Sequence, residues 1–126
     1  MPNMLERGNA WLEAMRQRHA TQDIEYARGE ETIPLRATVG KTVFQVSREY
    51  GLFERTESRD YIVEAARLVL GGAVTLPKKG DRIREADGAK AFIYEVMAPG
   101  TEPCWRYSDL QRRALRIHTK LVGQEG

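Results

Sequence analysis

Hydrophobic and polar residues alternate along most of the chain after its first twenty positions, and this period of two is the feature that most limits the possible folds. Successive side chains of a strand point to opposite faces, so a strand with one buried face shows this spacing. It occurs at Ile24 and Tyr26, and again at Ile33, Leu35, Ala37 and Val39. We expect two strands joined by a loop at residues 28–30. Pro34 favours an edge position for the second, because proline has no N–H to donate to a neighbour.

Turn-forming residues separate further alternating segments. The clearest hairpin joins residues 81–85 to residues 91–96 through a turn at Asp87-Gly88. Gly40-Lys41 is expected to separate this strand from residues 43–46, which form a third strand or the start of a bent one, and Tyr50-Gly51 marks another turn. Residues 54–70 are expected to form a strand followed by irregular chain.

The last alternating segment is expected to point Leu115, Ile117 and Thr119 to one side, and Arg116, His118 and Lys120 to a solvated side. It would pair with the alternating residues Trp105 and Tyr107. Short strands with turns at regular spacing predict a mainly β fold, a small β-barrel or sandwich with one N-terminal amphipathic helix.

The helix is expected within residues 1–20. Met4, Leu5, Trp11, Leu12 and Met15 recur at helical spacing and share one face. Asn3 followed by Glu6 resembles a capping box. The apolar face can pack on its own domain or on a neighbouring subunit, with Trp11 as the anchor. Trp11, Leu12 and Met15 are therefore candidate subunit contacts.

The chain of 126 residues is expected to form a single domain, 1–126, with the helix at 1–20, a β-barrel-like body at 21–123 and a tail at 124–126. Its longest apolar runs span only a few residues, far fewer than the ~20 of a membrane helix. The N-terminus lacks the charge and apolar order of a secretory signal, which predicts an intracellular protein without membrane contact.

Catalytic chemistry has few candidate residues. The sequence holds two histidines and one cysteine, Cys104, which supply neither a nucleophilic triad nor a closed metal site. We expect Cys104 to be a buried or half-buried thiol, and most carboxylates to be solvated or to serve in turns, as Asp81 does after Gly80. The sequence thus predicts no enzyme activity, no metal, no cofactor and no small-molecule substrate.

The net charge is +2, and the two signs are mixed except in the last third, which is basic. Trp105, Arg106 and Tyr107 stand near Arg112, Arg113 and Arg116, residue types that can stack bases and contact phosphates. A core Trp and Tyr beside solvated arginines explains the same residues. Arg112, Arg113 and Arg116 are candidates for non-specific contact with packaged DNA.

Several motifs together resemble a known family. They are Asp23-Ile24-Glu25-Tyr26-Ala27-Arg28-Gly29, Ala37-Thr38-Val39-Gly40, Ser58-Arg59-Asp60-Tyr61, Pro77-Lys78-Lys79-Gly80-Asp81-Arg82-Ile83, Tyr94-Glu95-Val96-Met97, Trp105-Arg106-Tyr107-Ser108-Asp109 and Arg116-Ile117-His118-Thr119-Lys120. The chain resembles the head-completion or head–tail joining (stopper, connector) proteins of tailed bacteriophages and prophages, from about Leu5 to Gly123.

The resemblance implies a structural virion protein that is assembled in the host bacterial cytoplasm. It implies a homo-oligomeric ring, a hexamer or dodecamer, in the neck between head and tail, with a portal or adaptor protein above and a tail-end protein below. Such a ring closes the DNA-filled head and joins it to the tail. The loop from Gly71 to Asp81, with Gly72, Lys78 and Lys79, is a candidate for partner contacts. A tail-terminator or tail-completion protein and a small nucleic-acid-binding module remain alternatives.

Overall fold

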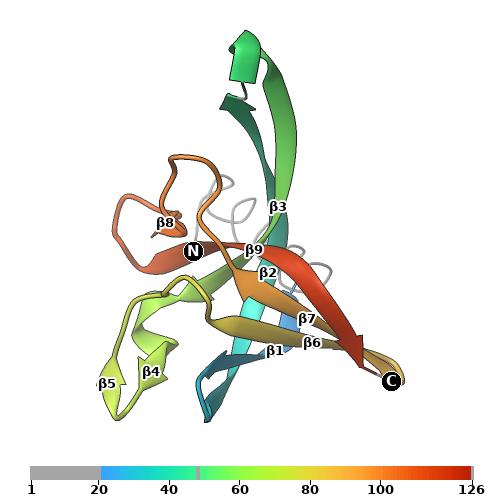
Figure 1. Ribbon diagram of the computed structural model, residues 1–126. Coiled ribbons are helices and arrows are strands. Elements are labelled where there is room, and N and C mark those ends of the chain that lie inside the picture. The colour runs from blue at the N-terminus through green and yellow to red at the C-terminus, as the bar shows by residue number, and fades with distance from the viewer. Residues whose placement is uncertain (1–20, 48, 126) are drawn as a thin grey trace, which may run out of the picture.

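The computed structural model describes residues 21–47 and 49–125. Nine strands and two 3₁₀ turns follow one another in this part of the chain (Figure 1). The strands are β1 Thr21–Arg28, β2 Glu31–Ser47, β3 Phe53–Glu64, β4 Val69–Leu70, β5 Ala73–Val74, β6 Arg82–Asp87, β7 Lys90–Val96, β8 Trp105–Tyr107 and β9 Ala114–Glu125; the turns are η1 Glu49–Gly51 and η2 Ala65–Arg67. The predicted mainly β fold is confirmed, and the predicted helix over residues 1–20 lies outside the described residues.

Seven strands form one antiparallel sheet in the order β3-β2-β1-β6-β7-β9-β8. β9 also pairs with β3, from Arg59↔Thr119 to Glu64↔Ala114, so the pairings lead from β3 round to β9 and back to β3. β4 and β5 form a separate two-stranded hairpin. Hydrogen bonding thus continues through six strands without a break. β8 pairs with the first half of β9, on the side opposite β3.

The core lies on the face that the alternating pattern selects. Its members come from β1, β2, β3, β6, β7, β9 and the η2–β4 segment: Ile24, Tyr26, Leu35, Ala37, Tyr61, Val63, Leu68, Leu70, Ile83, Val96, Leu115 and Ile117. The predicted inward orientation of Leu115, Ile117 and Thr119 is confirmed, since all three are buried. The hairpin of β6 and β7 is also confirmed, with Asp87 paired to Lys90 across the turn.

The predicted break at Gly40-Lys41 is wrong, because β2 runs through both residues and stays paired with β3. Gly40 lies beside the Arg116 side chain, and an added Cβ would be 3.4 Å from Arg116 Nη1, an ordinary contact distance. The predicted edge position is wrong for β2 as a whole, since β1 and β3 flank the strand. Its first segment through Ala37 pairs with β1 only, which is why Pro34 is tolerated there.

Candidate functional site

The most prominent feature of the molecule is a two-stranded arm, residues 42–47 and 49–58, that projects from the sheet (Figure 1). β1 pairs with β2 only as far as Thr38, and β9 pairs with β3 only from Arg59. Beyond the Lys41↔Arg59 pair, the two strands therefore continue as a ribbon without a third strand. Six residues of extended chain from Thr42 carry the ribbon about 20 Å outward.

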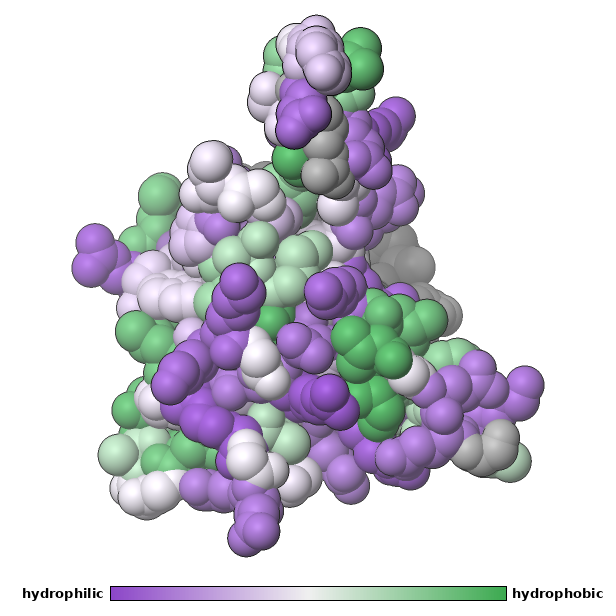
Figure 2. All heavy atoms as spheres, viewed as in Figure 1, coloured by the Kyte–Doolittle hydropathy of each residue, from purple (hydrophilic) through white to green (hydrophobic). Residues whose placement is uncertain are grey.

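The arm ends in an exposed hydrophobic tip, residues 49–53. Tyr50 is 96% exposed, Leu52 66% and Phe53 71%, and Figure 2 shows hydrophobic surface at this projecting end. Tyr50 and Gly51 both take positive φ values, which let the chain reverse within η1. Exposed large apolar side chains in a cluster mark interaction sites. The sequence predicts a turn here but not a candidate contact site, although large apolar residues in an expected turn are the signal that could have identified one.

The base of the arm is packed against the body. The ring of Phe44 meets that of His118 edge-on at a centroid distance of 5.1 Å. Further out, a Cβ on Gly100, in the β7–β8 connection, would lie 3.6 Å from Val46 Cγ2. One face of the arm is therefore supported by β9 and the β7–β8 connection, while Tyr50, Leu52 and Phe53 at the tip remain largely exposed.

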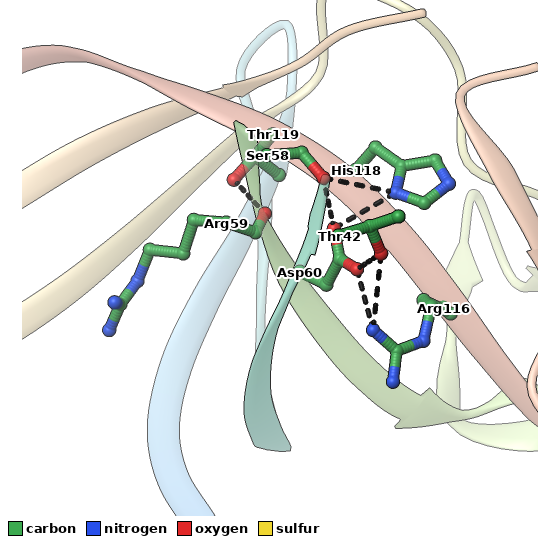
Figure 3. Close-up of polar contacts among 7 residues, drawn as sticks. All are labelled: Thr42, Ser58, Arg59, Asp60, Arg116, His118 and Thr119. Carbon is green, nitrogen blue, oxygen red and sulfur yellow. Dashed lines mark hydrogen bonds and ion pairs between the residues drawn. The ribbon is translucent and has the colours of Figure 1, made fainter. Parts of the chain in front are cut away.

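A buried polar network joins three strands where the arm leaves the sheet (Figure 3). Asp60 of β3 is fully buried and accepts hydrogen bonds from Thr42 of β2 and from Ser58 Oγ at 2.6 Å. From β9, Arg116 Nη1 lies 2.6 Å from Asp60 Oδ2, and His118 Nδ1 lies 2.9 Å from Oδ1. One carboxylate therefore holds β2, β3 and β9 together at the base of the arm.

The predicted solvated position of His118 is wrong, because the β7–β8 connection and Phe44 cover that face of β9 and leave the residue 2% exposed. Ser58, His118 and Asp60 are the residue types of a hydrolytic triad, but their geometry differs. In a triad the two ring nitrogens serve different partners. Here Ser58 Oγ, at 3.3 Å, and Asp60 both approach Nδ1, and Ser58 donates to Asp60. The cluster thus has the geometry of a structural clamp.

Low pH is expected to weaken this clamp. Burial raises the pKa of Asp60, but hydrogen bonds from His118, Ser58, Thr42 and Arg116 outweigh burial and lower the pKa overall. A carboxyl whose pKa is lower in the folded state stabilises the fold above its unfolded pKa of ~3.9, and this stabilisation is lost as pH falls toward the folded value. We expect the free energy of unfolding, measured with urea from pH 7 to pH 2, to fall below about pH 4. An unchanged free energy down to pH 2 would contradict the clamp.

A second buried carboxylate, Asp81, organises the β4–β5 side of the molecule. Arg28 holds it with two contacts, Nε to Oδ1 at 2.9 Å and Nη2 to Oδ2 at 2.7 Å, and Tyr26 donates its hydroxyl hydrogen to Oδ2. The Lys78 backbone N–H adds a bond of 2.9 Å. The view of Asp81 as a turn residue alone is wrong, since these partners bury it to 4% exposure.

The β4–β5 hairpin and its connection to β6 present a second exposed surface. Val69, Val74 and Leu76 are exposed apolar residues there. The candidate contacts Gly72, Lys78 and Lys79 are exposed on the same segment. The other candidates, Trp11, Leu12 and Met15, lie outside the described residues. The structure thus brings hydrophobic and basic residues together on this hairpin.

The three arginines proposed to face DNA lie in two different environments. Arg112 and Arg113 are exposed in the loop after β8, whereas Arg116 is bound to Asp60. The Arg112 guanidinium lies 5.7 Å from the centre of the Tyr107 ring. At the start of β8, Cys104 is half-buried as expected, and burial raises the pKa of its thiol.

Residues 21–47 and 49–125 hold neither a cluster of metal-ligating side chains nor a helix that could span a membrane. This part of the chain brings no three His, Cys, Asp or Glu side chains together as a metal site. The same residues include no helix of the length and apolar character that a bilayer crossing requires.

Comparison with known proteins connects this architecture to one family. No curated protein matches the sequence. The family model described as phage head-tail joining protein matches residues 2–126, which is nearly the whole chain. The arm, the exposed hairpin and the buried clamps thus belong to a member of the phage head–tail joining protein family, whose proteins are structural components of the virion.

Proposed function

We propose that the chain forms a ring in the neck of a tailed phage or prophage particle, where it closes the DNA-filled head and joins it to the tail. The observation that carries this proposal is the family match over residues 2–126. The ring, its hexameric or dodecameric size and its neighbours, a portal or adaptor protein above and a tail-end protein below, come from the resemblance. Assembly in the host bacterial cytoplasm belongs to the same proposal.

Two projections of the molecule support a joining role. Figure 1 shows the arm and the β4–β5 hairpin leaving the sheet toward opposite ends. Both carry exposed hydrophobic residues, which a joint between two different partners requires. The unbroken circuit of six paired strands between them supports a rigid, barrel-like body. We assign Gly72, Lys78 and Lys79 to the contact with one axial neighbour.

A closed ring needs two different complementary patches on every subunit. The apolar face with Trp11, Leu12 and Met15 is one candidate patch in the sequence. Edges of the sheet offer others. Among the described residues, no strand pairs with the edge of β2 that faces away from β1 before Thr38, or with the edge of β8 that faces away from β9. A chain of this size can therefore supply distinct contacts on separate flanks.

Removing the protein tests its place in the particle. Phage or prophage carrying an early stop codon in this gene is expected to produce separate heads and tails, because the joint between them is missing. Electron microscopy of the lysate, with the intact gene supplied in trans as control, checks this result. Normal tailed particles without the protein would overturn the proposal, and joined particles with tails of abnormal length would identify a tail terminator.

A nucleic-acid-binding module makes a different prediction for the purified protein. Such a module would bind DNA as a monomer with an affinity that falls steeply with salt, because its arginines release counterions from phosphate. The only candidate arginines that the described chain leaves exposed after β8 are Arg112 and Arg113. Ring formation without such binding supports the joining role.

A further inference from the structure

We propose that the arm tip of each copy docks on β8 and the turn that follows it in the neighbouring copy. This inference rests on the ring of the proposed function and names one of its subunit contacts. We define the β8 loop as residues 105–113, which comprise β8 and the turn that leads into β9.

Within residues 21–47 and 49–125, no packing partner covers the apolar side chains of the tip. Tyr50, Leu52 and Phe53 keep most of their surface exposed, while the other end of the arm is packed and hydrogen-bonded. A two-stranded ribbon is marginally stable in water without further packing. Its hydrophobic end is therefore suited to a surface outside the chain.

The β8 loop offers an ordered surface of matching character. Asp109 Oδ1 accepts bonds from the backbone N–H groups of Arg113 at 2.9 Å and Ala114 at 3.0 Å, which hold the loop in shape. Leu110 stands 97% exposed on this loop, and Arg112 lies over the ring of Tyr107. Tyrosine and arginine are the residue types that dominate interface energies.

The two surfaces carry opposite charge. Residues 49–57 contain three glutamates and one arginine, a net charge of −2. Residues 105–113 contain three arginines and one aspartate, a net charge of +2. Complementary charge around apolar contacts selects a partner and sets its orientation. The tip of one copy and the β8 loop of another therefore match in exposed apolar residues and in charge.

The placement of the two surfaces is compatible with a closed ring. The arm and the β4–β5 hairpin point to opposite ends, whereas the β8 loop lies on the flank between them (Figure 1). Repeated contacts between opposite ends of the subunit generate an open stack. Contacts between an end and a flank rotate each copy relative to the previous one, which allows a ring to close. This geometry favours the β8 loop over the β4–β5 hairpin as the receptor for the tip. The arm's length of about 20 Å gives it reach beyond its own body.

Cross-linking within the particle tests the contact. The intact chain would carry Cys104→Ser, to remove its own thiol, together with Tyr50→Cys and Leu110→Cys. After oxidation, a non-reducing gel of purified particles is expected to show a ladder of multiples of the chain, because each copy links to two neighbours. The matched control combines Cys104→Ser and Tyr50→Cys with Val74→Cys on the β4–β5 hairpin, and it is expected to remain monomeric.

The outcomes separate this inference from the proposed function. Particles that contain the chain but give no ladder with the first pair, or give one with the control pair, would overturn the docking. Particles that lack the chain altogether would overturn the neck assignment itself.

A charge exchange provides a second test on purified protein, in case cysteines at these positions disturb incorporation. Glu49→Arg and Arg112→Glu are each expected to raise the concentration at half-assembly about tenfold, and the double variant to restore it. Independent effects of the two substitutions, without restoration, would contradict the pairing of the two surfaces.

Discussion

Replacing Asp60 with asparagine is expected to lower the free energy of unfolding by about 3 kcal/mol or more. Asp60 is fully buried and is the common acceptor for Thr42, Ser58, Arg116 and His118. Asparagine keeps the shape but turns one acceptor oxygen into a donor, so it faces at least one existing donor. It also leaves the partly buried Arg116 guanidinium without its counter-charge.

Urea unfolding at neutral pH measures this loss. Asp23→Asn is the matched control, because Asp23 is 88% exposed and its contact with Arg36 is long, at 3.5 Å. Exposed pairs of this kind contribute little, and we expect a change within about 0.5 kcal/mol. Equal losses in the two variants would show that burial and the network do not matter. The Asp60 variant should also show a smaller loss of stability below pH 4 than the wild type, since one titrating group is removed while Asp81, whose pKa is also lowered, remains.

The strands were predictable because their signal is local. Alternation at Ile24, Leu35 and Ile117 depends only on which face of each strand is buried, and the structure confirms that face. Gly40 was misread because glycine often marks a turn, whereas here it lies inside β2, beside the side chain of Arg116, which is 76 positions away. A local pattern cannot distinguish these two uses of glycine.

The buried carboxylates could not be predicted either, because their partners also lie far away in the sequence. Asp60 and Asp81 stand among charged residues in the sequence, as solvated carboxylates do. Their partners Arg116 and Arg28 lie 56 and 53 positions away, and only the strand order brings them together. The third, Glu85, is likewise held by Arg59 and Tyr61 from a strand that is distant in the chain. Each of the three carboxylates can be buried because an arginine balances its charge. The fold brings that arginine close to the carboxylate.

Only part of the arm could be predicted from the sequence. The two strands and the turn at Tyr50-Gly51 follow from the sequence, but the arm exists because β1 and β9 stop pairing before the ribbon ends. Where a neighbouring strand ends is a property of the whole sheet. The exposed tip therefore became a functional candidate only with the topology in hand.

Substituting Asp81 is expected to have the second-largest effect, with a loss of about 3 kcal/mol for Asp81→Ala. Burial, followed by the hydrogen bond to Asp81, raises the pKa of Tyr26, so this tyrosine keeps its hydrogen and donates it. Removing the carboxylate leaves that buried hydroxyl without its acceptor, and leaves Arg28 without its counter-charge. The bond that anchors the Lys78 backbone N–H is lost as well.

A double-mutant cycle isolates the contribution of the hydrogen bond between the Tyr26 hydroxyl and Asp81 to the free energy of unfolding. Tyr26→Phe alone is expected to cost about 1 kcal/mol, because it removes one hydrogen bond and leaves the other contacts of Asp81 in place. In the Asp81→Ala background the same substitution is expected to cost nothing or to be slightly stabilising, because it removes a buried donor that no longer has an acceptor. Urea unfolding of the wild type, both single variants and the double variant measures the coupling. Strictly additive losses would mean that Tyr26 and Asp81 stabilise the fold independently, and that the network does not hold the β4–β5 side to β1.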